Sequence, residues 1–345
     1  MGSSISGFRV DWIDGVAPDD VSPKSYPYVR VVSETLALLL IASQNWNFDH
    51  KPTEYAARRA HVNGMRRYAI STYFLLLNGI YELTTPSVVE DRLGSAIIME
   101  DDADWDVSIK TQLQSFASAV RSLQSAQKSP TTSPYGDDWD ILWLGHCGVE
   151  CKTHQPYHLT PNDPTIPASR HFLPYWRDPP PIDRPDDMRL TCTANDGVCS
   201  LFYAVSYRGA QRILAALSVN PSGLAEEIDT GAQFDVSLGR MCGHGFLRCF
   251  TTYPALTGTY HSAGPSTKAS DIHSEEGDSV GFSSRGVVYS TMLNINRLLK
   301  GERTVKATWD DVAVPEINPE DVKTREGFTP FVGRKRSLWQ PKRVP

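Results

Sequence analysis

Three short apolar segments in the middle of the chain have the length and composition of buried strands. Residues 95–99 read SAIIM, residues 139–144 read WDILWL and residues 199–206 read CSLFYAVS. Apolar runs of this length, bounded by turn-forming residues, are typical of strands that are covered on both faces. The pattern therefore predicts three strands of one sheet.

Two further segments carry their apolar residues at helical spacing. The first lies between the first two strands and has the apolar positions Ile109, Leu113, Phe116, Ala117, Val120 and Leu123. The second, residues 209–217 (GAQRILAAL), follows the third strand directly. Both predict helices that bury one face. The alternation of strands and helices indicates the α/β class, with a mostly parallel sheet and helices on both of its faces.

The chain is expected to form a single domain over residues 1–300. Within it, residues 152–187 hold 9 of the 24 prolines. Because proline removes backbone donors and fixes the backbone, this part is predicted to be a surface excursion with little regular structure. Residues 301–345 show little periodicity and predict an irregular, partly disordered tail.

Composition excludes some classes of protein. Hydrophobic residues make up 40% of the chain and charged residues 21%, as in ordinary globular proteins. The net charge of −6 argues against nucleic-acid binding. No apolar run approaches the roughly 20 residues of a membrane span, and the first residues lack the charged and apolar regions of a secretory signal. We therefore expect no transmembrane segment, and the compartment stays open.

The cysteines of the chain could form disulfides or bind zinc. The six are Cys147, Cys151, Cys192, Cys199, Cys242 and Cys249. An even number permits disulfides, but their pairing cannot be read from sequence. Alternatively, Cys147, Cys151 and His154 are ligands of a zinc site.

A cluster of carboxylates follows the first predicted strand. It consists of Glu100, Asp101, Asp102, Asp104 and Asp106. One interpretation is a solvated loop whose last member, Asp106, caps the following helix. The other is a site for a hard cation, because Mg²⁺ and Mn²⁺ take one or two carboxylates together with substrate phosphates. In α/β sheets ligands bind beyond the carboxyl ends of strands, which is where this cluster is expected.

Five segments occur in one order along the chain. They are SAIIMEDDADWD, WDILWLGHCG, CSLFYAVSYRGAQRIL, FDVSLGRMC and the stretch Ser270-Asp271-Ile272. In this order they resemble glycosyltransferase family 25, the group that contains lipopolysaccharide glycosyltransferases and collagen galactosyltransferases. The similarity is greatest to fungal members, which share the DWD extension and the LGHCG run. It covers residues from about 93 to 272.

The resemblance implies a GT-A-like fold and the inverting transfer of galactose or glucose from a UDP-sugar to a glycan or glycoprotein acceptor. It also implies Mn²⁺ or Mg²⁺, because a divalent ion stabilises the charge of the departing diphosphate. Glu100, Asp101 and Asp102 stand where the family has its metal motif. On this basis Asp102 is the expected metal ligand, with Asp104 or Asp106 as a substitute. Glu100 and Asp101 are expected to position the metal's waters or the donor ribose.

Further site residues follow from the same resemblance. Asp235 matches an acidic position of the family and is the candidate base or second metal-side carboxylate, with helix capping as the alternative. Gly145 and His146 follow a strand and are placed to face the sugar, although a satisfied loop histidine is the simpler account of His146. His261 lies where some GT-A enzymes have a third metal ligand.

The chain departs from the family pattern in two places. It lacks the family's first strand with its arginine-x-aspartate-arginine turn, and residues 7–15 resemble the second strand instead. The family's alanine-histidine pair remains at Ala60-His61, but residues 68–87 interrupt the helix expected to run from His61 through residues 88–92. We interpret this insertion as an unspliced intron or faulty gene model, or alternatively as a lineage-specific loop.

Loss of donor-side residues predicts weak or no transferase activity in the chain as written. It leaves two further hypotheses. One is a catalytically inactive remnant that binds a glycan or nucleotide. The other is a non-enzymatic protein whose acidic loop binds a cation such as Ca²⁺.

Overall fold

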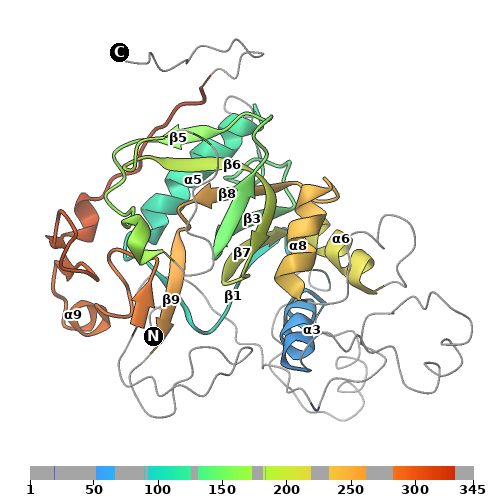
Figure 1. Cartoon of the computed structure of the whole chain (residues 1–345), viewed down its shortest axis with the longest axis horizontal. Helices are drawn as coiled ribbons and strands as arrows, with labels where there is room; N and C mark the ends of the chain where they lie inside the picture. The colour runs from blue at the N-terminus through green and yellow to red at the C-terminus, as the bar shows by residue number, and fades with distance from the viewer. Residues whose placement is uncertain are drawn as a thin grey trace, which may run out of the picture.

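The computed structural model describes the chain in several ranges (Figure 1). They are residues 19, 52–66, 89, 92–125, 131–172, 182, 184–218, 233–261 and 283–330. The expected insertion at 68–87, the resemblance at 7–15 and the stretch 270–272 lie outside the described residues. What is described has mixed α/β architecture and forms a single domain.

A seven-stranded sheet lies at the centre of the described part. Its strands follow the order β1 (Ser95–Met99), β7 (Phe202–Ser206), β3 (Ile141–Gly145), β8 (Cys249–Tyr253), β6 (Arg189–Val198) and β4 (Gly148–Cys151), and β5 (His158–Thr160) pairs with β6. The three predicted strands are confirmed as β1, β3 and β7, and they are neighbours in the sheet, with β7 between β1 and β3.

The sheet is mostly antiparallel, so the prediction of a mostly parallel sheet is wrong. β7 opposes both β1 and β3, and β6 opposes β8, β4 and β5. Among the described strands of this sheet, the β3–β8 pair alone is parallel. Strand direction cannot be predicted from such segments, because a strand covered on both faces is a continuous apolar run whichever way it points. Since β1 and β3 both oppose β7, and β8 runs with β3, the carboxyl ends of β1, β3 and β8 meet at one edge.

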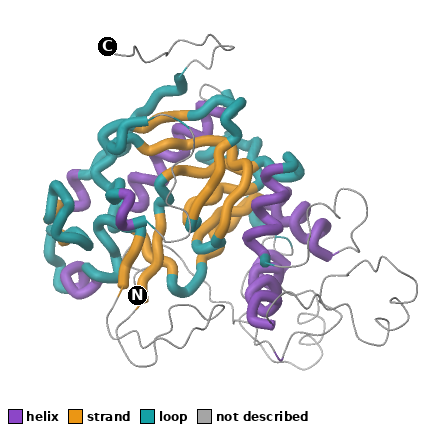
Figure 2. The backbone as a smooth tube through the Cα atoms, viewed as in Figure 1, coloured by secondary structure: helices purple, strands orange, loops and turns teal. Residues whose placement is uncertain are grey.

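Helices cover both faces of the sheet, as predicted (Figure 2). They are α3 (Pro52–Arg66), α5 (Ile109–Leu123), α6 (Tyr207–Ser218) and α8 (Phe234–Gly243). Leu142 and Leu144 of β3 pack with α5 on one face, whereas Ile141 and Trp143 pack with the other three helices on the opposite face. This alternation follows from the two-residue period of a strand. None of the described helices is long and apolar enough to cross a membrane.

A smaller sheet continues from the edge where β1 and β8 end. β2 (Ala103–Trp105) follows β1, and β9 (Thr257–His261) follows β8. β9 pairs antiparallel with β2 on one side and with β10 (Ser283–Arg285) on the other. The acidic loop therefore lies between two strands of different sheets.

The proline-rich segment and the C-terminal segment pack onto this framework. Their regular elements are β5, the 3-10 helix η3 (Ser169–His171), α9 (Ile295–Leu299), β11 (Val305–Lys306), β12 (Glu316–Ile317) and the 3-10 helix η4 (Pro319–Asp321). Val305 is buried with Tyr289, and Phe328 pairs with Leu159 of β5. The segment 301–330 thus has more structure than the expected irregular tail, and residues 331–345 lie outside the described part.

All six cysteines are paired. The disulfides are Cys147–Cys199, Cys151–Cys192 and Cys242–Cys249. Because Cys147 and Cys151 are bonded to other cysteines, the alternative zinc site is excluded. Three disulfides are typical of proteins that fold in an oxidising compartment.

Candidate functional site

The acidic loop Glu100–Asp102 connects β1 to β2 at the edge where three strands end. The backbone N–H of Glu100 donates to the carbonyl of Leu201 at 2.9 Å, and the N–H of Tyr260 donates to the carbonyl of Asp102 at 2.9 Å. Asp101 is exposed, while the side chains of Glu100 and Asp102 are each 33% exposed. The loop is therefore fixed on both sides, and its carboxylates remain accessible.

Glu100 is held by two side chains that sequence analysis did not connect to it. Ser200 Oγ donates to Glu100 Oε1 at 2.8 Å, and Nε2 of His61 lies 3.5 Å from the same oxygen and 3.1 Å from Ser200 Oγ. Burial would raise the pKa of Glu100, but the hydrogen bond and charge of His61, together with the bond from Ser200, bring that pKa below its ordinary value. Glu100 is therefore ionised at neutral pH.

His61 is fixed in turn from its other side. Its ring stacks on Phe234 at 4.5 Å between centroids, and Nδ1 lies 3.2 Å from the hydroxyl of Tyr203. Burial, and then the charge of Glu100, raise the pKa of Tyr203 well above its ordinary value. Because the phenol of Tyr203 stays protonated, it shares a hydrogen bond with Nδ1 of His61, while Nε2 faces Ser200 and Glu100. The alanine-histidine pair of the family resemblance was the sequence signal for His61, whereas Ser200 had none.

Asp102 lies beside His261, the last residue of β9. The distance from Asp102 Oδ2 to His261 Nε2 is 3.9 Å. No group of three or more His, Cys, Asp or Glu side chains placed to hold a metal occurs among the described residues. The accessible carboxylates of the loop are ligands of the type that Mg²⁺ and Mn²⁺ prefer.

The second half of the acidic cluster is buried. Asp104 accepts hydrogen bonds from Ser290 Oγ, from the Trp105 N–H at 2.8 Å and from the Met292 N–H at 3.3 Å. Burial raises the pKa of Asp104 to about 6 despite these bonds. Because Asp104 has no exposed surface, it lies inside the protein and not at the open edge with Asp102.

Asp106 has a similar structural role. Its two oxygens accept from the N–H of Ser108 at 2.8 Å and the N–H of Tyr289 at 3.1 Å. The first of these bonds is to Ser108, the N-cap residue of α5, so Asp106 holds the start of the helix from outside it and does not occupy the expected cap position. Burial raises the pKa of Asp106 to about 7. Asp104 and Asp106 together fix the segment around residues 289–292 against the start of α5.

Asp235 lies in the first turn of α8, close to the acidic loop. Its Oδ2 accepts from the Cys199 N–H at 2.7 Å, and its Oδ1 accepts from the N–H of Val236 at 2.9 Å. Cys199 has a φ of 66°, a left-handed conformation that the bond from Asp235 helps to hold. The next residue is Ser200, which contacts Glu100. Asp235 therefore sets the position of the turn that supports Glu100.

Gly145 and His146 are both buried at the end of β3. A Cβ at Gly145 would lie 2.0 Å from Thr257 Oγ1 and 2.8 Å from Phe202 Cβ, so close packing accounts for the glycine. His146 Nε2 donates to the carbonyl of Thr252 at 2.8 Å. Burial lowers the pKa of His146 to about 4, and the ring is neutral at neutral pH.

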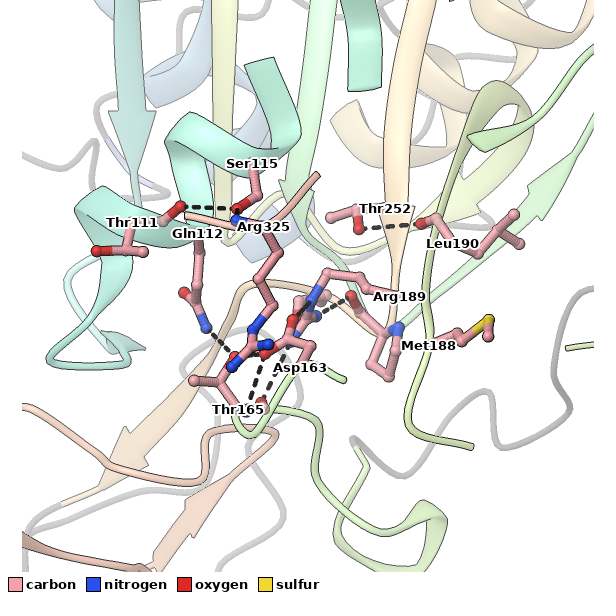
Figure 3. A network of polar contacts seen from close by, with 12 residues as sticks. Thr111, Gln112, Ser115, Asp163, Thr165, Met188, Arg189, Leu190, Thr252 and Arg325 are labelled. Atoms are coloured by element: carbon pink, nitrogen blue, oxygen red, sulfur yellow. Dashed lines mark hydrogen bonds and ion pairs between the residues drawn. The ribbon is translucent and has the colours of Figure 1, made fainter. Parts of the chain in front are cut away.

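A buried ion pair anchors the chain beyond β8 (Figure 3). Arg189 Nε donates to Asp163 Oδ2 at 2.6 Å, and Arg189 Nη1 donates to the carbonyl of Pro254 at 2.6 Å. Gln112 of α5 reaches the same network through Thr165, with 2.6 Å between its Nε2 and Thr165 Oγ1. Burial opposes the charge of Asp163, but Arg189 and Thr165 hold its pKa below the ordinary value. The network fixes the edge next to the candidate site.

Comparison with known proteins returns no relative. No family model matches the sequence, and no curated protein or solved structure matches the chain.

Proposed function

We propose that the chain is a metal-dependent glycosyltransferase that moves galactose or glucose from a UDP-sugar to a glycan or glycoprotein acceptor, with inversion. The observation that carries the proposal is the accessible Glu100–Asp102 loop, with Asp102 placed 3.9 Å from His261. The five segments that resemble glycosyltransferase family 25 support it. The GT-A assignment rests on that resemblance and agrees with a β1 strand whose carboxyl end leads into the acidic loop.

Asp102 and His261 are the residues that would hold Mn²⁺ or Mg²⁺, with Asp101 exposed beside them. When bound, the ion neutralises the diphosphate charge that grows as the glycosidic bond breaks. A donor set of one carboxylate and one imidazole leaves room for the two phosphates of the donor. We assign no metal-binding role to Asp104, because its carboxylate is buried among protein donors.

The remaining residues position the reactants. Glu100, kept ionised by His61 and Ser200, is placed to accept a hydrogen bond from a donor hydroxyl or from a water on the metal. Asp235 is the proposed base for the acceptor hydroxyl. Two backbone N–H groups occupy one lone pair on each of its oxygens, and the other lone pairs stay available for that proton.

Thermal unfolding with UDP and Mn²⁺ tests the proposal. We expect UDP to raise the melting temperature only when Mn²⁺ is present, and Asp102→Asn to abolish this rise. Asp310→Asn, which alters an exposed aspartate of the C-terminal segment, is the matched control and is expected to keep it. Release of UDP from UDP-galactose or UDP-glucose, followed by chromatography, then measures turnover.

The other outcomes identify the alternatives. UDP binding without any turnover of either donor would indicate the inactive remnant. Stabilisation by Ca²⁺ alone, with no response to UDP, would indicate a cation-binding protein without transferase activity. Absence of every response would contradict all three hypotheses.

A further inference from the structure

A cavity lies beside the candidate site, at the carboxyl ends of β3 and β8. Its buried floor is formed by His146, Tyr253 and Thr257, and its half-exposed rim by Phe172, Ala255 and Gly286. The volume of about 30 Å³ is room for one or two water molecules, or for one polar group of a larger ligand that rests on the rim.

Two polar atoms on the floor have no hydrogen-bond partner among the described residues. They are Nδ1 of His146 and Oγ1 of Thr257. His146 is 4% exposed and Thr257 is fully buried, so solvent does not satisfy either atom from outside. Buried polar atoms without protein partners are rare in native proteins, so each of the two is a candidate to bind a water or a polar group of a ligand.

The protonation of these groups defines the ligand chemistry. Because His146 Nε2 donates to the Thr252 carbonyl, the neutral ring presents Nδ1 as an acceptor. Thr257 offers a hydroxyl that donates or accepts. A ligand hydroxyl that donates to Nδ1 and accepts from Thr257 would satisfy both atoms.

The described wall residues offer no counter-charge to a charged ligand. None of the described residues that line the cavity carries a charge, and the aromatic rings of Phe172 and Tyr253 meet edge to face at 5.6 Å. An anion would face the lone pair of Nδ1, and a cation would find no carboxylate. Mostly apolar walls with a few polar groups on the floor suit a neutral polyhydroxylated ring, whose C–H faces pack on aromatic residues.

The position of the cavity indicates which sugar it would hold. Thr257 begins β9 and His261 ends it, so the two lie ~13 Å apart along the strand. A donor sugar is bonded directly to the diphosphate and must lie next to Asp102 and His261. The disulfide between Cys147, which lines the cavity, and Cys199, which precedes Ser200, links the cavity to the acidic loop.

We propose that this cavity is a subsite for a hydroxyl group of the carbohydrate acceptor, held by His146 and Thr257. The inference rests on the proposed function, because it assigns the cavity to the acceptor of that reaction.

Saturation-transfer NMR on the full chain tests the subsite with methyl galactoside, methyl glucoside and methyl mannoside. We expect at least one glycoside to bind, with affinity at least tenfold weaker in Thr257→Val. Thr257→Ser keeps the hydroxyl and is expected to keep binding. Unfolding curves of both variants establish that each is folded before binding is compared.

A parallel measurement separates this inference from the proposed function. The unaltered chain is titrated with UDP and Mn²⁺, which requires no sugar. A UDP response without any glycoside binding that depends on the Thr257 hydroxyl would overturn the subsite alone, and the cavity would hold water only. Glycoside binding that depends on Thr257 without a UDP response would overturn the transferase and keep a sugar-binding cavity. Loss of both responses would overturn both.

Discussion

His61 of α3 and Glu100 of the acidic loop lie 3.5 Å apart, measured from Nε2 to Oε1. Ser200 Oγ bonds to the same carboxylate oxygen, so three distant parts of the chain meet at one carboxylate. The contact fixes Glu100 beside Asp102 and keeps it ionised. The stabilising effect of this contact should therefore depend on pH.

Replacing Glu100 by Gln should reduce stability at neutral pH and have little effect in acid. The pKa of Glu100 is lowered in the folded state, so its ionised form stabilises the fold above the unfolded value of 4.5. That contribution is lost as pH falls through the lower, folded pKa. Solvent screening at a part-exposed carboxylate limits it to about 1 kcal/mol. Urea unfolding of both proteins at pH 3 to 7 measures the difference, and an equal difference across this range would contradict the prediction.

Asp104→Asn should stabilise the protein at alkaline pH. Burial raises the pKa of Asp104 to about 6, so the folded state binds more protons than the unfolded state above pH 3.8. Stability is therefore lost as pH rises through this window, by about 3 kcal/mol for the full shift. The amide of Asn removes the charge, keeps one oxygen for the N–H groups of Trp105 and Met292, and donates to Ser290 Oγ. Unfolding at pH 5 and pH 8 should show a flatter pH profile for the variant.

The matched substitution Asp106→Asn should combine two opposing effects. Burial raises the pKa of Asp106 to about 7, so the ionised carboxylate costs stability at pH 8, and its removal should flatten the pH profile as at Asp104. Both oxygens of Asp106 accept from backbone N–H groups, those of Ser108 and Tyr289, so an amide would turn its NH₂ toward one of these donors and leave it unsatisfied, at a cost of about 1–3 kcal/mol. Unfolding at pH 5 and pH 8 measures both effects, and a pH profile as steep as that of the unaltered protein would contradict the prediction.

Three of the seven strands of the central sheet were predictable from sequence, but their directions were not. β1, β3 and β7 are uninterrupted apolar runs. Such a run identifies a buried strand but does not show whether the strand is parallel or antiparallel to its neighbours. β6 was missed for a different reason. Its segment Arg189–Val198 mixes threonines, Asn195 and Asp196 with apolar residues, and its second half is only partly buried.

The candidate site was predictable only in part. The resemblance identified Asp102 and His261, and the structure brings these two side chains together. Asp104 lies two residues after Asp102, yet the segment around Ser290 covers it and leaves Asp102 accessible. Local spacing cannot show which carboxylates a distant segment will bury. The support of Glu100 by His61 likewise depends on how α3 packs, which no local pattern encodes.

The disulfides should contribute unequally to stability. Cys147–Cys199 joins residues separated by 52 positions, whereas Cys242–Cys249 spans 7. Because the Cys151–Cys192 disulfide stays in place inside the 147–199 loop, the first pair closes a loop of only about 11 residues, and loop-closure entropy predicts a loss of ~3 kcal/mol when it is replaced by serines and ~2 kcal/mol for the second pair. Guanidinium unfolding of the two double variants compares these values. A larger loss from the Cys242–Cys249 variant would show that native-state contacts, and not chain entropy, set the order.

Two buried threonines should respond differently to loss of their hydroxyl groups. Thr251 Oγ1 donates to the carbonyl of Trp143 at 2.9 Å, whereas Thr257 Oγ1 has no partner among the described residues. Thr251→Val removes a buried hydrogen bond, and the carbonyl of Trp143 loses one of its donors. The substitution should therefore lower the free energy of unfolding by about 1 kcal/mol. Thr257→Val replaces a hydroxyl that makes no hydrogen bond to the described residues in the unliganded protein. The substitution should change the free energy of unfolding by less than about 0.5 kcal/mol. Urea unfolding without ligand measures both values. An equal loss from the two substitutions would mean that a firmly held water already satisfies Thr257, because removing that water's partner would then carry the same cost.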